Sequence, residues 1–561
     1  MFLLTTLDVA QLVAPEPAHV SFVARTLRSL GVAVEPPSVE KMLTQLLDKC
    51  CKSVEARVLG FLKAAVVPVS LTVDTTGALN GADVVNYMAA AASSGQVPLL
   101  LDAVERPSGA DADASADWAA RDLARVVKKL ASPVAGCVLP CSRPHSRQTR
   151  ERLEKQFPGM YFHGCMRNAL LTLARQIFVP SAAVSESDRK HSVALPFSQD
   201  LQQCALQCQD LVFLLPRREE VSYLGKSDST DNRLMHVTVR RRLTVEDGFV
   251  AILQAEPFLD ADKVLDQLLC ASPEETPSDG LTRTHHSDDI AHLQTQLTKV
   301  VRSSQFTDKL RKYLGIIRPI HALLLSLSGD AKSSPMLLSE VYASFSQLVQ
   351  ELAANPLLQP EEKTSLHILV RQQQERVLGT AHFLSYLLDP VLLGENLTVD
   401  TKAEAEQKLM ASFHADGSPL SDTDKEALYE QYMDFKKFAF NQKANKADTL
   451  AFRTLKERKK SPLEFWFVDG AKWPSLQAIA CRIFVMPVCT FSAKCVISAA
   501  GIDPIMVSKM VDARTSANLT YVRVNSRQLH VAESSGTVLT PATHNPQLES
   551  SSNDITASMV V

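Results

Sequence analysis

The sequence predicts an α/β domain followed by a long, mostly helical segment. Between Val67 and Phe178, short β-rich segments alternate with segments of helical apolar spacing, and Gly, Asn and Ser turns separate them. From Ser181 to Lys460, apolar residues recur at helical spacing between polar loops. Beyond Ser461 the chain is again dense in apolar residues. We therefore predict a mixed sheet with helices on its faces, a large helical insertion and a helical C-terminal region.

The α/β part contains predicted elements in the order βββαβαβα. The first strand follows Pro68, and the first helix carries its apolar residues on one stripe. In chain order the elements are predicted over Val69–Val73, Asp83–Ala89, Pro98–Val104, Asp113–Leu130, Gly136–Leu139, Ser146–Phe157, Met160–His163 and Asn168–Ile177. This order resembles the ribonuclease H-like layout.

Helical spacing continues through the insertion and the C-terminal region. In the insertion the clearest predicted helices span Leu310–Leu327, Leu337–Ala353, Lys363–Leu378 and Ala381–Leu388. Near the C-terminus, Leu476, Ile479, Ala480, Ile483 and Phe484 form one helix face, which ends before Pro487. The tail after His530 is rich in Ser, Thr, Asn and Pro, so we expect it to be disordered.

Composition places the chain among ordinary globular proteins. Its 561 residues include 59 basic and 62 acidic side chains, so no global field attracts nucleic acid. The start lacks a basic segment and no apolar run approaches the length of a membrane span, so we expect neither signal peptide nor membrane contact. The 11 cysteines form no CxxC pair, which favours a reducing compartment. We expect a nuclear or cytoplasmic protein that is not secreted.

Four segments together resemble the hAT-type transposases. They are "LTVDTTGALNGADVVNY", "RERLEKQFPGMYFHGCMRNALLTLARQI", "GTAHFLSYLLDPVLLGENL" and "FWFVDGAKWPSLQAIACRIFVMPVCTFSAKCVISAAG", and they occur in the order found in that family. The resemblance implies a ribonuclease H-like domain split by a helical insertion and closed by a dimerisation region. The expected boundaries are 1–66 for a helical lead-in without the family's zinc finger, 67–180 for the ribonuclease H-like domain, 181–460 for the insertion, 461–530 for the dimerisation region and 531–561 for the tail.

The resemblance also identifies the positions of a two-metal site. Enzymes of this kind hold two divalent ions, about 3.5 to 4 Å apart, with carboxylates from distant parts of the chain. Asp74 matches the first carboxylate. Cys141, which lies 24 residues before Cys165, stands at the second position, and Lys494 stands at the third.

These replacements change the charge of the site. Its formal charge goes from about −3 to about 0, because a neutral thiol and an ammonium replace two carboxylates. At 4 Å and an effective dielectric constant near 20, the Lys494 charge would repel each unit of metal charge by about 4 kcal/mol. We therefore expect no Mg²⁺ or Mn²⁺ cofactor and no catalysis, with Asp74 a remnant that forms a turn or pairs with Lys494.

Two alternative metal sites and one alternative without any function remain open. A new site in which Asp102 and Asp117 replace the missing carboxylates is the enzyme alternative. A zinc site at Cys137, Cys141, His145, His163 and Cys165 matches no finger spacing, and buried cysteines more often act as small apolar residues. A third alternative is a decayed element without a selected function.

The remaining candidates concern partners. Basic patches provide six DNA-binding candidates, although acidic neighbours also fit a solvated helix face: Arg143, Arg147, Arg150, Arg240, Arg241 and Arg242. The apolar C-terminal region provides six dimerisation candidates: Trp466, Trp473, Leu476, Ile479, Ile483 and Phe484. The implied partner is a second copy or a related hAT-like protein, with DNA as a second class and no small-molecule substrate.

Overall fold

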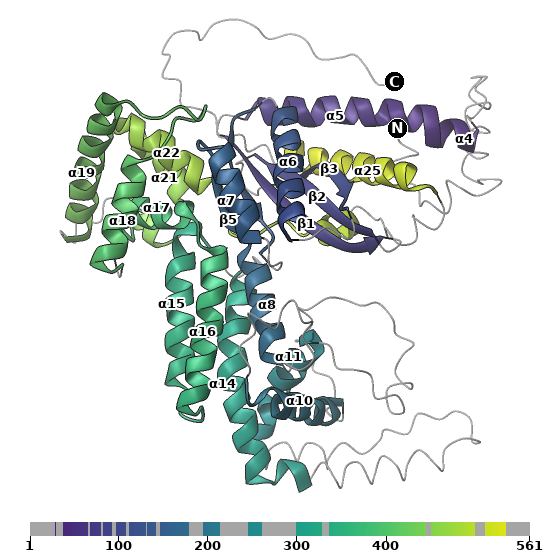
Figure 1. Cartoon of the computed structure of the whole chain (residues 1–561), viewed down its shortest axis with the longest axis vertical. Helices are drawn as coiled ribbons and strands as arrows, with labels where there is room; N and C mark the ends of the chain where they lie inside the picture. Colours follow the sequence, from purple (N-terminus) through teal and green to yellow (C-terminus); the bar gives the residue numbers. More distant parts are fainter. Residues whose placement is uncertain are drawn as a thin grey trace, which may run out of the picture.

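The chain is built around one sheet, from which a group of long helices projects (Figure 1). The computed structural model describes residue 29 and residues 38–65, 68–79, 82–91, 97–107, 112–130, 132–141, 146–178, 195–213, 245–260, 299–327, 336–395, 397–444, 450–499 and 511–534. In this part of the chain, no helix is long and apolar enough to span a bilayer.

Five strands form the sheet in the order β3-β2-β1-β4-β5. They are β1 (Val69–Leu79), β2 (Ala82–Ala90), β3 (Leu99–Glu105), β4 (Val134–Leu139) and β5 (Tyr161–Gly164). The first three strands are antiparallel, and β4 and β5 run parallel to β1. Every residue of β4 is buried, as expected for a parallel strand covered on both faces.

The predicted order of elements is confirmed. Helices α6 (Ala112–Leu130), α7 (Ser146–Gln156) and α8 (Met166–Phe178) follow β3, β4 and β5 respectively. The strand predicted over Val69–Val73 is longer than expected and continues to Leu79.

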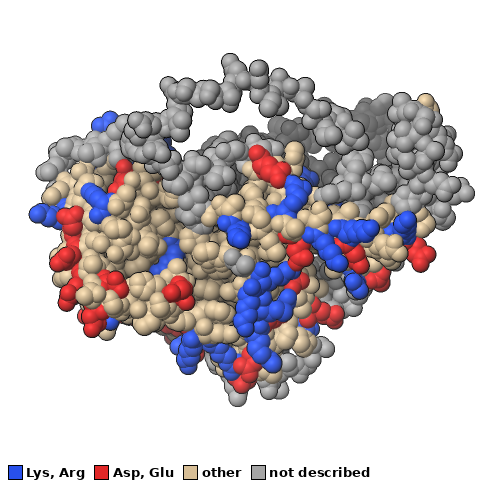
Figure 2. Space-filling view, turned by 90° about the horizontal axis from the view of Figure 1, so that it is seen from above, with Lys and Arg blue, Asp and Glu red and all other residues tan. Residues whose placement is uncertain are grey.

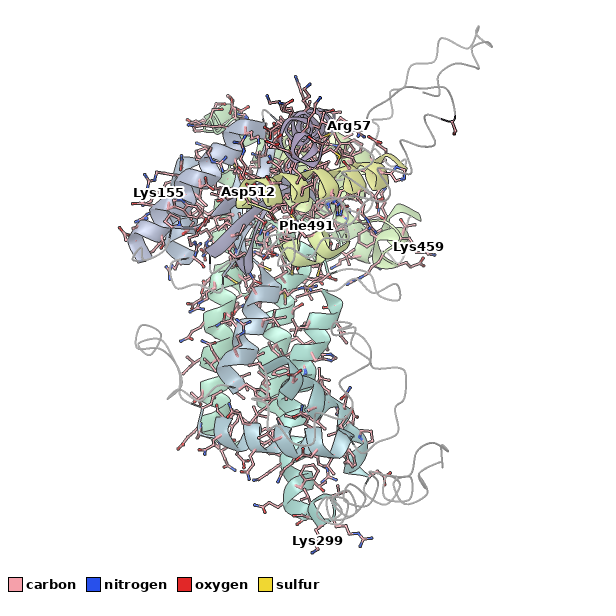
Figure 3. The ribbon with its side chains drawn as sticks, turned by 90° about the vertical axis from the view of Figure 1, so that its right-hand side faces the viewer. Arg57, Lys155, Lys299, Lys459, Phe491 and Asp512 are labelled. Carbon is pink, nitrogen blue, oxygen red and sulfur yellow. The ribbon has the colours of Figure 1, made fainter. Side chains whose placement is uncertain are left out.

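Helices from both ends of the described chain complete the α/β unit. Helix α25 (Ala513–Ser534) packs against β3 and against α5 (Leu47–Lys63). The sheet lies between α25 and α7, as Figures 1 and 3 both show. Asn525 on α25 accepts a hydrogen bond from the Leu100 N–H and donates one to the Leu100 C=O, each 2.8 Å long. This contact covers part of the edge strand β3.

Helix α25 corrects the expected start of the tail. The tail was expected to begin at residue 531, but the helix continues to Ser534. The rest of the tail lies outside the described residues.

The insertion leaves the sheet through α8 and returns through α17. Its helices are α10 (Ser198–Phe213), α11 (Val245–Gln254), α14 (Ser304–Ser326), α15 (Val341–Ala354), α16 (Pro360–Val377) and α17 (Thr380–Leu388). The four helices predicted after residue 310 correspond to α14 to α17. Gly164 and Gly379 permit the close approach of β5 and the end of α16, because a Cβ on either would meet a backbone oxygen, that of Arg376 or Phe162.

The C-terminal helices pack beside the returning chain. They are α18 (Val399–Met410), α19 (Asp422–Ala444), α20 (Leu450–Lys456), α21 (Pro462–Val468), α22 (Pro474–Phe484) and α23 (Ala493–Ala499). Trp466, Trp473 and Phe435 form an aromatic cluster between α19 and the α21–α22 pair, with ring centroids 4.7 to 5.9 Å apart.

Candidate functional site

The three predicted catalytic positions lie on elements that meet at one edge of the sheet. β1 and β4 are neighbouring parallel strands, and Thr72 on β1 is paired with Val138 on β4. Asp74 therefore lies where β4 ends and β1 projects beyond it, and Cys141 follows β4 directly. The first turn of α23 reaches this edge, because its Ala493 contacts Asp74.

Asp74 accepts a hydrogen bond from the backbone of α23. Its Oδ2 lies 2.8 Å from the N–H of Ala493. Burial raises the pKa of the Asp74 carboxyl, although the N–H groups of Ala493 and Thr75 and the charge of Arg167 oppose this effect. Because the first N–H groups of a helix have no partner within the helix, this carboxylate serves as a cap for α23.

Cys141 is a buried, protonated thiol. Its Sγ donates to the carbonyl of Cys165 over 3.1 Å. Burial, reinforced by the neighbouring Cys165, raises the pKa of Cys141 to about 12. At neutral pH the side chain is therefore a weak hydrogen-bond donor and not an anionic ligand.

Cys165 connects the end of β5 to the segment that leads into α23. Thr490 donates to its Sγ from the backbone N–H over 3.4 Å and from the hydroxyl over 3.5 Å. Burial raises the pKa of the Cys165 thiol, but hydrogen bonds from Cys489 and Thr490 outweigh this effect and lower it overall. In the sequence, Cys165 marks the distance to Cys141 and belongs to the zinc set, and nothing in the spacing indicates this contact.

Lys494 is the second residue of α23, next to the Ala493 that contacts Asp74. Only its place in the helix is described, and its side chain lies outside the described part of the structure. The pairing of Asp74 with Lys494 therefore stays a prediction.

This donor set does not fit a pair of hard divalent ions. Mg²⁺ and Mn²⁺ favour oxygen ligands, whereas the described residues of the site offer one carboxylate that already accepts an N–H group, and a neutral thiol whose hydrogen points at a carbonyl. Among the described residues, no three His, Cys, Asp or Glu side chains are grouped to hold a metal ion.

The alternative carboxylates are engaged elsewhere. Asp102 pairs with Arg125 on α6 over 2.7 Å, and Asp117 pairs with Arg152 on α7 over 2.7 Å. The strand register aligns Asp102 with Tyr87 and Val73, so it shares their face of the sheet. Asp74 is the next residue after Val73 and therefore points to the opposite face. The geometry does not favour a replacement site built from these two residues.

The described arginine candidates differ in exposure. Arg147 is exposed and pairs with Glu151 over 2.9 Å. Arg150 is mostly buried and donates to the carbonyls of Arg376 and Leu378, at the end of α16, over 3.2 and 2.9 Å. Its guanidinium thus joins α7 to the insertion. A DNA contact would require an arginine that faces solvent, whereas Arg150 is mostly buried. Arg143, Arg240, Arg241 and Arg242 lie outside the described residues.

Basic and acidic side chains mix on the face of the molecule that Figure 2 shows. Figure 2 shows groups of Lys and Arg with Asp and Glu at their borders. This distribution resembles the solvated helix face that the sequence analysis weighed against DNA binding.

The dimerisation candidates form the interior of the C-terminal region. Five of the six are buried within the protomer, and Phe484 is half-buried. Trp466 donates from Nε1 to the Leu388 carbonyl over 2.9 Å, and Trp473 donates to Asp434 over 2.8 Å. These side chains therefore stabilise the region and connect it to α17 and α19, instead of presenting a surface to a partner.

A buried pair of histidines, which no sequence pattern indicated, lies between β5 and α17. His163 on β5 and His382 on α17 are fully buried, with ring centroids 4.6 Å apart in a T-shaped arrangement. Burial lowers the pKa of His163 to about 4, and burial together with His163 lowers the pKa of His382. Each histidine lies within a quoted motif, but only the tertiary structure brings the two together.

Comparison with known proteins supports the C-terminal assignment. Residues 428–519 match the sequence model of the hAT family C-terminal dimerisation region. The match begins in α19, before the boundary at 461 that the sequence analysis expected. No curated protein matches the chain.

Proposed function

We propose that this protein is a transposase-derived, hAT-like protein that acts by dimerisation and has lost two-metal catalysis. The match of residues 428–519 to a dimerisation region carries the proposal. The partner is a second copy of the chain or a related hAT-like protein.

The α/β unit supports the transposase origin. The strand order, with three antiparallel strands followed by two parallel ones, agrees with the ribonuclease H-like domain that the resemblance implies. Asp74, Cys141 and the start of α23 meet at the edge where such a domain would hold its catalytic carboxylates.

The side chains at that edge support the loss of catalysis. Asp74 caps α23 and Cys141 is a neutral thiol, so two positions that should bind metal take part in hydrogen bonds within the protein. The proposal does not depend on DNA contact, since Arg147 is the one described arginine candidate that faces solvent.

Two measurements on the full-length chain test the proposal. Sedimentation velocity at micromolar concentrations should show a dimer, and a strict monomer would contradict the dimerisation part. Supercoiled plasmid incubated with the protein and Mg²⁺ or Mn²⁺ should not be nicked more than in a metal-free control. Metal-dependent nicking that disappears in Asp74→Ala would overturn the inactive assignment.

A further inference from the structure

Helix α19 carries apolar side chains on two adjacent faces, whose centres lie about 110° apart around the helix. Its inner face buries Leu428, Tyr432, Phe435 and Ala439 against the rest of the protomer. Its outer face exposes Tyr429, Met433 and Phe440, which are 54%, 43% and 65% exposed. The apolar residues of α19 thus extend further around the helix than the side that the protomer buries, and no described residue covers the outer face.

The three exposed residues lie on one side of the helix. At 3.6 residues per turn they lie within about 40° of one another around the helix, and they extend over about 16 Å along it. Figure 1 shows α19 at the outer edge of the molecule, with α18, α21 and α22 on its inner side. Tyr, Phe and Met are also residue types that are enriched in protein interfaces.

We propose that the α19 stripe, defined as Tyr429, Met433 and Phe440, is the contact through which two copies of this chain pack antiparallel about a twofold axis. The inference rests on the proposed dimerisation. A second copy is the occupant because the stripe lies within residues 428–519, the region that matches a dimerisation family.

Charge along α19 favours the antiparallel direction. Its first turn carries Asp422 and Asp424, and its last turn carries Lys443. Glu430 and Lys437 are exposed and flank the same side of the stripe. With the twofold axis midway between Tyr429 and Phe440, Tyr429 of one copy faces Phe440 of the other, and Glu430 lies close to Lys437. A parallel pair would instead place the two acidic first turns beside each other.

The first test removes apolar contact without disturbing the protomer. Phe440→Glu and Tyr429→Glu place a charge at exposed positions, so each should keep the wild-type thermal melt and raise the dimer dissociation constant at least tenfold by sedimentation velocity. Val399→Glu is the matched control, because Val399 is 85% exposed on α18, outside the matched region. It should leave the dissociation constant unchanged.

A charge exchange tests the direction of packing. Glu430→Lys and Lys437→Glu should each weaken the dimer, because each places like charges opposite one another. The double variant should restore most of the affinity, since every pair is again of opposite charge. Two single losses that simply add in the double variant would contradict the antiparallel arrangement.

The outcomes separate this inference from the proposed function. If the wild-type chain is a monomer at all concentrations tested, both fail. If the wild type is a dimer and Phe440→Glu and Tyr429→Glu leave it unchanged, dimerisation stands and the α19 stripe is overturned as its interface.

Discussion

At the scale of single residues, the carboxylate of Asp74 joins β1 to α23, which are 419 residues apart in the chain. The acid that the sequence analysis interpreted as a catalytic remnant thus has a structural contact of its own. Capping needs a single acceptor oxygen, so it does not require the two missing carboxylates.

Replacement of Asp74 should therefore destabilise the fold. We expect Asp74→Ala to lower the free energy of unfolding by about 1 to 2 kcal/mol, because the Ala493 N–H loses its acceptor. Asp74→Asn keeps an oxygen acceptor and should cost less. Urea unfolding followed by circular dichroism measures both variants. Asp117→Ala, at a half-exposed surface ion pair, is the control and should change stability by less than about 0.5 kcal/mol.

At the scale of elements, α25 completes the sheet from the far end of the described chain. The side-chain amide of Asn525 pairs with both backbone groups of Leu100, as a neighbouring strand would. Because Leu100 and Asn525 are buried, water does not replace these hydrogen bonds.

Loss of this amide should loosen the edge of the sheet. We expect Asn525→Ala to cost about 2 to 4 kcal/mol of unfolding free energy, since it leaves a buried donor and a buried acceptor without partners. Hydrogen exchange at the Leu100 amide should also become faster. Arg527→Ala, at an exposed position of the same helix, should change neither quantity. Unchanged exchange at Leu100 in Asn525→Ala would contradict the role assigned to α25.

At the scale of the whole molecule, the α/β unit and the helical insertion share one buried boundary. His163 and His382 meet there. Burial lowers the pKa of both histidines, and the positive charge of Arg150 on α7 lowers it further. Arg150 also joins α7 to the end of α16. Charge introduced at this boundary should thus affect the whole fold.

This boundary predicts a loss of stability in acid. An unfolded histidine has a pKa near 6.5, whereas the pKa of His163 in the fold is about 4, so protons favour the unfolded chain between these values. The stability that the neutral, buried His163 permits is fully present above about pH 6.5. We expect the free energy of unfolding to fall by about 1 to 2 kcal/mol by pH 5. Urea midpoints at pH 7.5 and pH 5 measure it.

The loss of unfolding free energy between pH 7.5 and pH 5 should be smaller in the His163→Gln/His382→Gln double variant. His530→Gln, at an exposed position on α25, should retain the wild-type fall. An equal fall in the double variant would show that other groups cause the acid sensitivity.

Most of the α/β elements could be predicted from the sequence because their signals are local. The segments over 98–104 and 146–157 combine apolar patterning with nearby turn residues, and both agree with the structure within one residue at each end. The contacts of Arg150 and the start of the dimerisation region could not be predicted in this way. An arginine on a charged helix has the same pattern whether it faces solvent or a carbonyl.

The sequence by itself determined the order of the strands and helices along the chain, since this order depends on residue type and spacing. The replacement of two carboxylates by Cys141 and Lys494 rests on the family resemblance and stays a prediction. Tertiary structure alone decided the role of each side chain. In the fold, Trp466 and Trp473 are buried inside the protomer, Asp74 accepts a hydrogen bond from α23, and the α19 stripe is exposed. The physical reason is that burial and hydrogen bonding depend on segments hundreds of residues apart, whose approach no local pattern records.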